Sequence, residues 1–235
     1  MRFSMANYQP EVLAVFEQSL KELRASGVEI VEITDFKIPE ELAGAAGNTI
    51  INEFKSELNA YLASTPTTIK TRSLADLIAF NKAHAKEELS LFGQEYLEIA
   101  EAQTGVKDNP AYLESRKLAK RMAGAEGIDR LLAVYKLDAL IAPTTNPAGK
   151  INFRKSQSGS EASVSTIAAI AGYPHLSVPM RFVNDLPVGL SFIGTAWSDA
   201  ELLAFGYAFE QRTKARRPPN FIRSNEEKKG QFNRF

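Results

Sequence analysis

The sequence contains no cysteine, only two histidines, no net charge and no long hydrophobic run. The absence of cysteine excludes disulfides, thiolate zinc sites and cysteine nucleophiles. Two histidines, His84 and His175, leave little material for a histidine-based metal centre, so we expect no metal. Because 28 basic residues balance 28 acidic residues, the chain as a whole is not attracted to nucleic acid or anionic lipid. We therefore expect no nucleic-acid partner.

No segment approaches the roughly 18 to 20 apolar residues that a membrane span requires, so we expect no membrane association. Residues 1–10 are polar and lack the apolar core of a secretory signal, which favours a cytoplasmic location. The length of 235 residues and the hydrophobic content of 44% allow a sizeable core. We expect residues 1–221 to form a single α/β domain and residues 222–235 a flexible polar tail.

Hydrophobic periodicity predicts a mostly helical first half. Residues 12–23 have helical spacing, and residues 28–33 alternate as a half-buried strand. A helix over residues 46–63 places its apolar side chains on one stripe: Ile50, Ile51, Phe54, Leu58, Tyr61 and Leu62. Ser73 and Asp76 form a capping box, and short helices follow between residues 87 and 103.

A long helix is predicted from Asn109 and Pro110, its N-cap and first residue, to Tyr135. Its inward side chains are expected to be Leu118, Met122, Ala125, Leu132 and Tyr135. Residues 138–142 form a short apolar run typical of a strand that is buried on both faces. Residues 149–160 are expected to form a polar loop.

The last segments predict a helix, a hairpin and a final helix. Residues 161–171 form a small-residue helix that ends at Gly172, and strands 176–180 and 188–193 are joined by a turn at Asn184-Asp185. Ser198 and Glu201 form a capping box for the final helix, whose apolar side chains are Leu202, Leu203, Phe205 and Phe209. Together, the predicted helices and strands indicate an α/β fold with a mixed β-sheet flanked by helices.

Few motifs in the sequence carry chemistry. The G-x-S-x-G nucleophile elbow, the Walker loop and the G-x-G-x-x-G motif do not occur, and Ser191 lies inside a predicted strand. A serine that uses His175 or His84 as its base stays an alternative, against local hydrogen bonding or solvent exposure of these histidines.

Two polar segments are candidate binding sites. Residues 156–163 are rich in glycine and serine and precede a helix, so their backbone N–H groups either bind an anion or belong to a flexible linker. Thr144, Thr145 and Asn146 follow a buried strand, where α/β sheets collect ligands. The competing interpretation is a strand-end turn stabilised by hydroxyl groups.

Three segments resemble the C-terminal portion of amidase signature enzymes: residues 137–144, 168–180 and 186–194. Weaker similarity lies in residues 77–81, 92–94, 200–203 and 209–211, so that the resemblance covers residues 8–220. The run Thr144-Thr-Asn-Pro147 resembles the peptide amidase and general amidase branch more than the transamidosome subunits. The resemblance implies an amidohydrolase fold in which one mixed sheet is wrapped by helices.

Members of this family hydrolyse amides through an acyl-serine intermediate without metal or organic cofactor. Their nucleophilic serine, a second serine in a cis peptide and a lysine lie in the N-terminal half, around a Gly-Gly-Ser-Ser-Gly-Gly-like run. This sequence has no such run, so no catalytic residue is transferred to it. The resemblance therefore implies a chain that is inactive alone and supplies scaffold and pocket wall, with Thr144, Thr145, Asn146, Ser163 and Ser165 as the substrate-pocket candidates.

The implied substrate of the full-length parent is a small-molecule or peptide amide. A C-terminal portion alone would expose a sheet edge and an apolar face, so we expect it to bind a copy of itself or an N-terminal amidase half. One alternative is a non-catalytic subunit or interaction protein derived from the family. Another is an independent serine hydrolase that uses His175.

Overall fold

The computed structural model describes residues 7–34, 36, 39–106, 109–149 and 163–219. The predicted tail, residues 150–160 of the predicted loop and all but Ser163 of the glycine- and serine-rich segment 156–163 lie outside these ranges. The described elements are α1 (Pro10–Arg24), α2 (Glu40–Ser64), α3 (Leu74–Ala83), α4 (Ala85–Glu88), α5 (Glu95–Glu101), α6 (Pro110–Ala123), the π-helix η1 (Gly124–Asp129), α7 (Arg130–Tyr135), β1 (Leu140–Pro143), α8 (Ser165–Ala171), β2 (His175–Val183), β3 (Leu186–Ile193) and α9 (Asp199–Thr213).

The three described strands form one sheet in the order β1-β3-β2, and both pairs are antiparallel. The predicted hairpin is confirmed: β2 and β3 are joined at Asn184 and Asp185, whose φ angles of 49° and 62° suit a tight hairpin turn. The predicted buried strand is also confirmed, since every residue of β1 is buried. Helices around this sheet give the predicted α/β class, while the described strands pair only antiparallel where a mixed sheet was expected.

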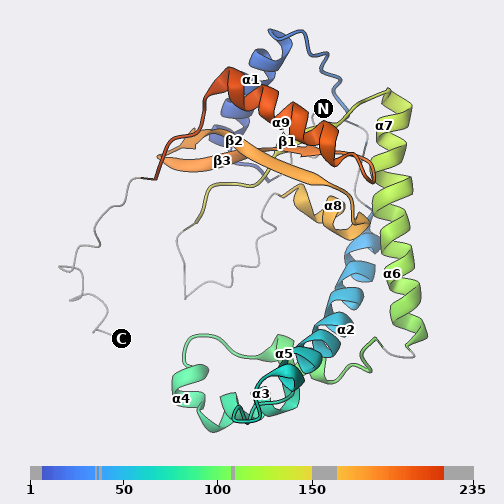
Figure 1. Cartoon of the computed structure of the whole chain (residues 1–235), viewed down its shortest axis with the longest axis vertical. Coiled ribbons are helices and arrows are strands. Elements are labelled where there is room, and N and C mark those ends of the chain that lie inside the picture. The colour runs from blue at the N-terminus through green and yellow to red at the C-terminus, as the bar shows by residue number, and fades with distance from the viewer. Residues whose placement is uncertain (1–6, 35, 37–38, 107–108, 150–162, 220–235) are drawn as a thin grey trace, which may run out of the picture.

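Helices α1, α8 and α9 surround the sheet and form the body of the molecule (Figure 1). Its core holds the most deeply buried side chains, among them Phe16, Leu20, Ile167, Met180, Leu190, Ile193 and Leu202. Gly206 allows α9 to approach β2, because a Cβ at this position would lie 2.4 Å from Cδ2 of Leu176. The predicted helix over residues 12–23 corresponds to α1. Of the predicted helix over residues 161–171, residues 161 and 162 lie outside the described ranges, and α8 begins at Ser165 and ends as expected at Gly172, which has a φ of 73°.

Helix α2 extends out of the body beside α6, and α3, α4 and α5 gather around its far end (Figure 1). We call residues 50–106 the arm. A small cluster of Leu74, Ile78 and Ala100, with Ile51, Leu58 and Leu97 packed against it, forms its described apolar core. The arm therefore buries far less apolar surface than the body.

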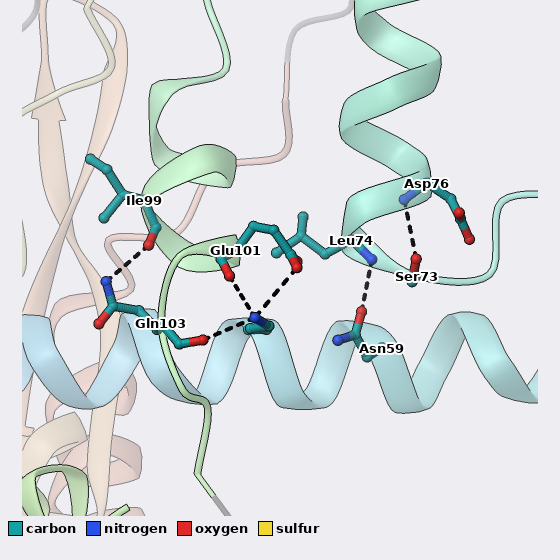
Figure 2. Close-up of polar contacts among 8 residues, drawn as sticks. Asn59, Ser73, Leu74, Asp76, Ile99, Glu101 and Gln103 are labelled. Carbon is teal, nitrogen blue, oxygen red and sulfur yellow. Dashed lines mark hydrogen bonds and ion pairs between the residues drawn. The ribbon is translucent and has the colours of Figure 1, made fainter.

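Polar contacts hold α3 and α5 to α2 (Figure 2). Oδ1 of Asn59 accepts a hydrogen bond of 2.7 Å from the Leu74 amide, and Nζ of Lys55 donates to the Gln103 carbonyl at 2.9 Å. Lys55 also binds the backbone carbonyl of Glu101 and lies 3.4 Å from its carboxylate. The predicted cap of α3 is confirmed, because Oγ of Ser73 accepts from the Asp76 amide at 3.1 Å.

The predicted continuous helix over residues 110–135 is wrong in its centre. It begins as expected, with Oδ1 of Asn109 accepting from the Tyr112 amide at 3.1 Å. The π-helix η1 then interrupts it, and the extra residue per turn rotates α7 about the helix axis relative to α6. Ala125, predicted to face inward, is exposed, whereas Leu131 is buried.

Three smaller predictions are also wrong. Residues 28–33 are not a strand: Glu32 makes a single β-bridge, and the segment pairs with none of β1, β2 and β3. On α9, Leu203 is 61% exposed, because it is rotated by roughly 100–120° about the helix axis from the buried Leu202 and Phe209. Oγ of Ser198 donates to the Thr195 carbonyl and does not cap the helix.

The predicted apolar stripe of α2 is only half correct. The helix is longer than expected, and its end at Thr65 before Pro66 is confirmed. Ile51 and Leu58 pack against the arm's core, as predicted for an inward face. The other part of the stripe faces outward: Ile50 is 62%, Phe54 39% and Tyr61 66% exposed. No helix in the described part of the chain has the length and hydropathy of a membrane span.

Candidate functional site

A group of hydroxyl side chains meets where β1 ends. Oγ1 of Thr144 lies 2.7 Å from Oγ of Ser177 and 2.9 Å from Oγ of Ser191, and Oγ of Ser191 lies 2.7 Å from Nε2 of His175. We call these four residues the hydroxyl cluster. Its hydrogen bonds run across all three strands, from the exposed Ser177 to the fully buried Ser191.

The pleat of the sheet explains why these side chains share one face. Ser177 of β2 is paired with Ser191 of β3, and Ser191 is paired with Ala142 of β1. Thr144 lies two residues beyond Ala142, on the same face, and its amide donates to the Gly189 carbonyl at 2.8 Å. The cluster therefore follows from strand register and alternation.

Gly189 makes the space in which the hydroxyl groups meet. A Cβ on this residue would lie 2.5 Å from Oγ of Ser177 and 2.6 Å from Oγ1 of Thr144. Both distances are shorter than any van der Waals contact, so a larger residue would push the hydroxyls apart. A glycine inside a strand commonly marks such a close approach.

Ser191 and His175 form a pair that is close enough for proton transfer. A serine nucleophile must also reach its substrate, and Ser191 has no accessible surface. Burial lowers the pKa of His175, which keeps the imidazole neutral beside the Ser191 hydroxyl. This geometry gives the pair a structural role in the sheet and disfavours the hypothesis of a serine hydrolase that uses His175.

The structure brings four of the five predicted pocket residues together. Thr145 forms an isolated antiparallel bridge with Ser163, and the Thr144 carbonyl accepts from the Val164 amide at 3.4 Å. Oγ of Ser163 lies 2.8 Å from Oγ of Ser165, at the start of α8. Two neighbouring chain segments thus carry these residues: Thr144 and Thr145 lie on one, and Ser163 and Ser165 lie on the other. The Thr144 hydroxyl also belongs to the hydroxyl cluster.

Asn146, the fifth predicted residue, binds the start of α1. Its Oδ1 accepts from the Gln9 amide at 2.9 Å, and its Nδ2 donates to the Asn7 carbonyl at 2.9 Å. The Tyr8 hydroxyl donates to the Pro143 carbonyl at 2.6 Å, and burial raises the pKa of this phenol. These contacts fasten the end of β1 to α1 and fix the position from which Thr144 and Thr145 project.

A second polar group links the π-helix to the sheet. Both oxygens of Asp129 accept hydrogen bonds of 2.6 Å, one from the Tyr173 hydroxyl and one from the Thr195 hydroxyl. The carboxylate raises the pKa of Tyr173 to about 12. The π-helix therefore aims Asp129 at the residues that follow α8 and β3. In the described ranges, no three histidine or acidic side chains come together as a metal site would require.

Similarity to known proteins identifies the family. The sequence matches the family model "Amidase" over residues 1–203. The chain belongs to the amidase family. A probable amidase of Arabidopsis thaliana is 32% identical over 89% of this chain and 38% of its own length.

Solved structures of peptide amidases are more similar to this chain. The native enzyme of Stenotrophomonas maltophilia is 45% identical, with a TM-score of 0.76, over 89% of this chain and 41% of its own. A peptide amidase in complex with the competitive inhibitor chymostatin is 45% identical, with a TM-score of 0.79, over 91% of this chain and 44% of its own. The chain thus spans about two-fifths of the length of these amidases.

Substitution of Gly189 by alanine tests the packing of the hydroxyl cluster. The new methyl group would displace the hydroxyls of Ser177 and Thr144, so we expect the free energy of unfolding to fall by about 1–3 kcal/mol. Gly44→Ala on exposed α2 is the matched control, because its Cβ meets no atom within 4 Å and helix propensity favours alanine by about 0.5–1 kcal/mol. Denaturant unfolding measures both; equal stability of G189A and the unsubstituted chain would contradict the packing argument.

The buried His175 predicts a pH dependence of stability. Its pKa is lowered in the folded chain, whereas an unfolded histidine has a pKa of about 6.5, so the unfolded chain binds the proton first. The contribution of His175 is complete above about pH 6.5 and is lost progressively as the pH falls toward its folded pKa. His175→Gln removes this titration, so the free energy of unfolding of the variant should depend less steeply on pH between pH 7 and 5, as measured by denaturant unfolding. The same pH dependence in the variant and the unsubstituted chain would show that the pKa of His175 does not change on unfolding.

Proposed function

We propose that this chain supplies the scaffold and part of the pocket wall of an amidase that hydrolyses peptide amides through an acyl-serine intermediate. The observation that carries the proposal is the 45% identity to solved peptide amidases over nine-tenths of the chain but about two-fifths of theirs. In this proposal the nucleophile, its base and the oxyanion donors come from polypeptide equivalent to the unmatched part of those enzymes.

The geometry at the end of β1 supports a role in the pocket wall. An amide presents a carbonyl acceptor and N–H donors, and hydroxyl groups can serve both. Thr145 is exposed, and Ser177 brings an exposed hydroxyl to the same strand end. Thr144 holds Ser177 in place through their shared hydrogen bond, while Asn146 fixes the backbone to α1. We assign Thr145 and Ser177 to the pocket wall and Thr144 and Asn146 to its support.

Catalysis needs groups that the described site does not bring together. Ser191 is buried, and the other clustered hydroxyls bond to each other, without an exposed serine beside a base in the described residues. The chain alone is therefore expected to be inactive. The alternative of a non-catalytic subunit predicts no activity under any condition, so activity measurements separate the two.

Complementation tests the proposed function. The full chain is co-expressed with the part of the Stenotrophomonas peptide amidase that it does not match, and ammonia release from a peptide amide is measured. The matched part of that peptide amidase, co-expressed in the same way, is the positive control. We expect activity only when both polypeptides are present, and inhibition of it by chymostatin. No activity with this chain while the control pair is active, or turnover by this chain alone, would contradict the proposal.

Within the active pair, Thr145→Val should lower kcat/KM about 3- to 10-fold, the usual effect of removing one hydrogen bond of about 0.5–1.5 kcal/mol. Thr213→Val, at the end of α9, removes a hydroxyl that bonds the Phe209 carbonyl and serves as the control. Equal kcat/KM for both variants would remove Thr145 from the pocket wall.

A further inference from the structure

Helix α2 carries an apolar stripe that the described part of the chain leaves exposed. Ile50, Phe54 and Tyr61 are separated by four and seven residues, which places them on one helical face. They are 62%, 39% and 66% exposed. We call these three residues the α2 stripe. The stripe runs from Ile50 to Tyr61 on α2 (Glu40–Ser64), the helix that extends out of the body into the arm (Figure 1).

A groove adjoins the stripe at the end of α2 that lies nearer the body. The groove has a volume of about 350 Å³ and is lined by Ala46 and Ile50 of α2, Ala119 and Lys120 of α6, and Ile170 and Gly172 at the end of α8. Ile50 thus belongs to both the stripe and the groove. Small side chains on two helices keep the groove open, and an Arg116–Glu53 ion pair of 3.6 Å borders it. Ile50 joins the stripe to the groove, whose lining also holds the charged side chains of Glu53, Arg116 and Lys120.

This surface lies on the part of the described chain that has the smaller apolar core. The arm's apolar core is small, and polar contacts such as those of Lys55 and Asn59 hold its helices together (Figure 2). The arm also exposes further large apolar side chains: Ile69, Phe80, Leu91, Phe92, Tyr96 and Ile99. Single exposed apolar residues are ordinary on a monomer, but several along one helix face, interrupted here by Glu57 between Phe54 and Tyr61, mark an interaction site.

The comparison with peptide amidases indicates what covers the surface. This chain matches 41–44% of the length of those enzymes. More than half of each peptide amidase is therefore polypeptide that has no counterpart in this chain. A second copy of this chain, related by a two-fold axis with the same surface on both sides, is the competing occupant that the experiment below distinguishes. The additional polypeptide of an amidase is long enough to cover stripe, groove and arm together.

We infer that the α2 stripe and its groove are the docking surface for the nucleophile-carrying part of an amidase. The inference rests on the proposed function and adds the location of the contact. Apolar burial of Ile50, Phe54 and Tyr61 supplies the attraction. Docking on α2 also supports the arm, whose own core is too small to fix it firmly.

Charge substitutions on the stripe test the inference. The triple variant Ile50→Lys, Phe54→Lys, Tyr61→Lys is co-expressed with the tagged unmatched part of the Stenotrophomonas peptide amidase, and the co-purified chain is quantified. The matched control is Leu203→Lys, Tyr207→Lys on α9, whose side chains are 61% and 66% exposed. Circular dichroism of each variant checks its helix content.

We expect the stripe variant to co-purify at least about tenfold less than the unsubstituted chain, as for loss of central apolar contacts, and the α9 variant to co-purify normally. Normal capture of the stripe variant, or equal loss in both variants, would overturn the inference. So would a dimer of this chain alone, seen by light scattering, that only the stripe substitutions dissociate, because the occupant would then be a second copy.

The same experiment separates this inference from the proposed function. Stripe-dependent capture without amidase activity, while the peptide amidase control pair is active, would leave the docking surface in place and reject the proposed function. Activity that survives the stripe substitutions would support the proposed function and place the contact elsewhere on the chain.

Discussion

The rest of the structure depends on the uneven burial of apolar side chains. The body surrounds its sheet with α1, α8 and α9 and buries large residues such as Phe16, Met180 and Leu190 completely. The arm buries Leu74, Ile78 and Ala100 and leaves the α2 stripe in solvent. Since apolar burial is the dominant favourable term in folding, we expect the body to hold the end of β1 firmly and the arm to open more readily. This imbalance connects the fold to the proposed role as one part of an amidase.

The sequence predicted the elements whose signals are local. The caps at Ser73 and Asn109, the Gly172 stop of α8 and the turn at Asn184-Asp185 were all correct, because each depends on a few adjacent residues. Periodicity could identify the apolar side of α2 but not which part of it the chain covers, since that depends on where α3 and α5 pack. The π-helix was missed because the prediction continued one helical period through residues 124–129, where the extra residue per turn shifts the phase of the apolar pattern.

The candidate site was predicted in part. Thr144 was recognised from its place after a buried strand, and its neighbours at Ser163 and Ser165 proved to be close by. Ser177, Ser191 and Gly189 were not recognised as its partners. The hairpin turn pairs Val183 with Leu186, and a regular ladder from there would pair Ser177 with Phe192. An irregularity between Pro179 and Arg181 shifts the register by one residue and pairs Ser177 with Ser191. Proline in β2 was the available signal, because it cannot donate to the ladder.

Hydrogen exchange measures the central claim most directly, because it reports local stability along the whole chain. It compares the chain alone with the chain bound to the unmatched part of a peptide amidase. We predict that, in the chain alone, amides of α3, α5 and the second half of α2 exchange faster than those of β2 and β3. In the complex, the arm amides should slow at least about tenfold while those of the sheet change little. An arm that is as protected as the sheet in the chain alone, and unchanged by binding, would contradict the account.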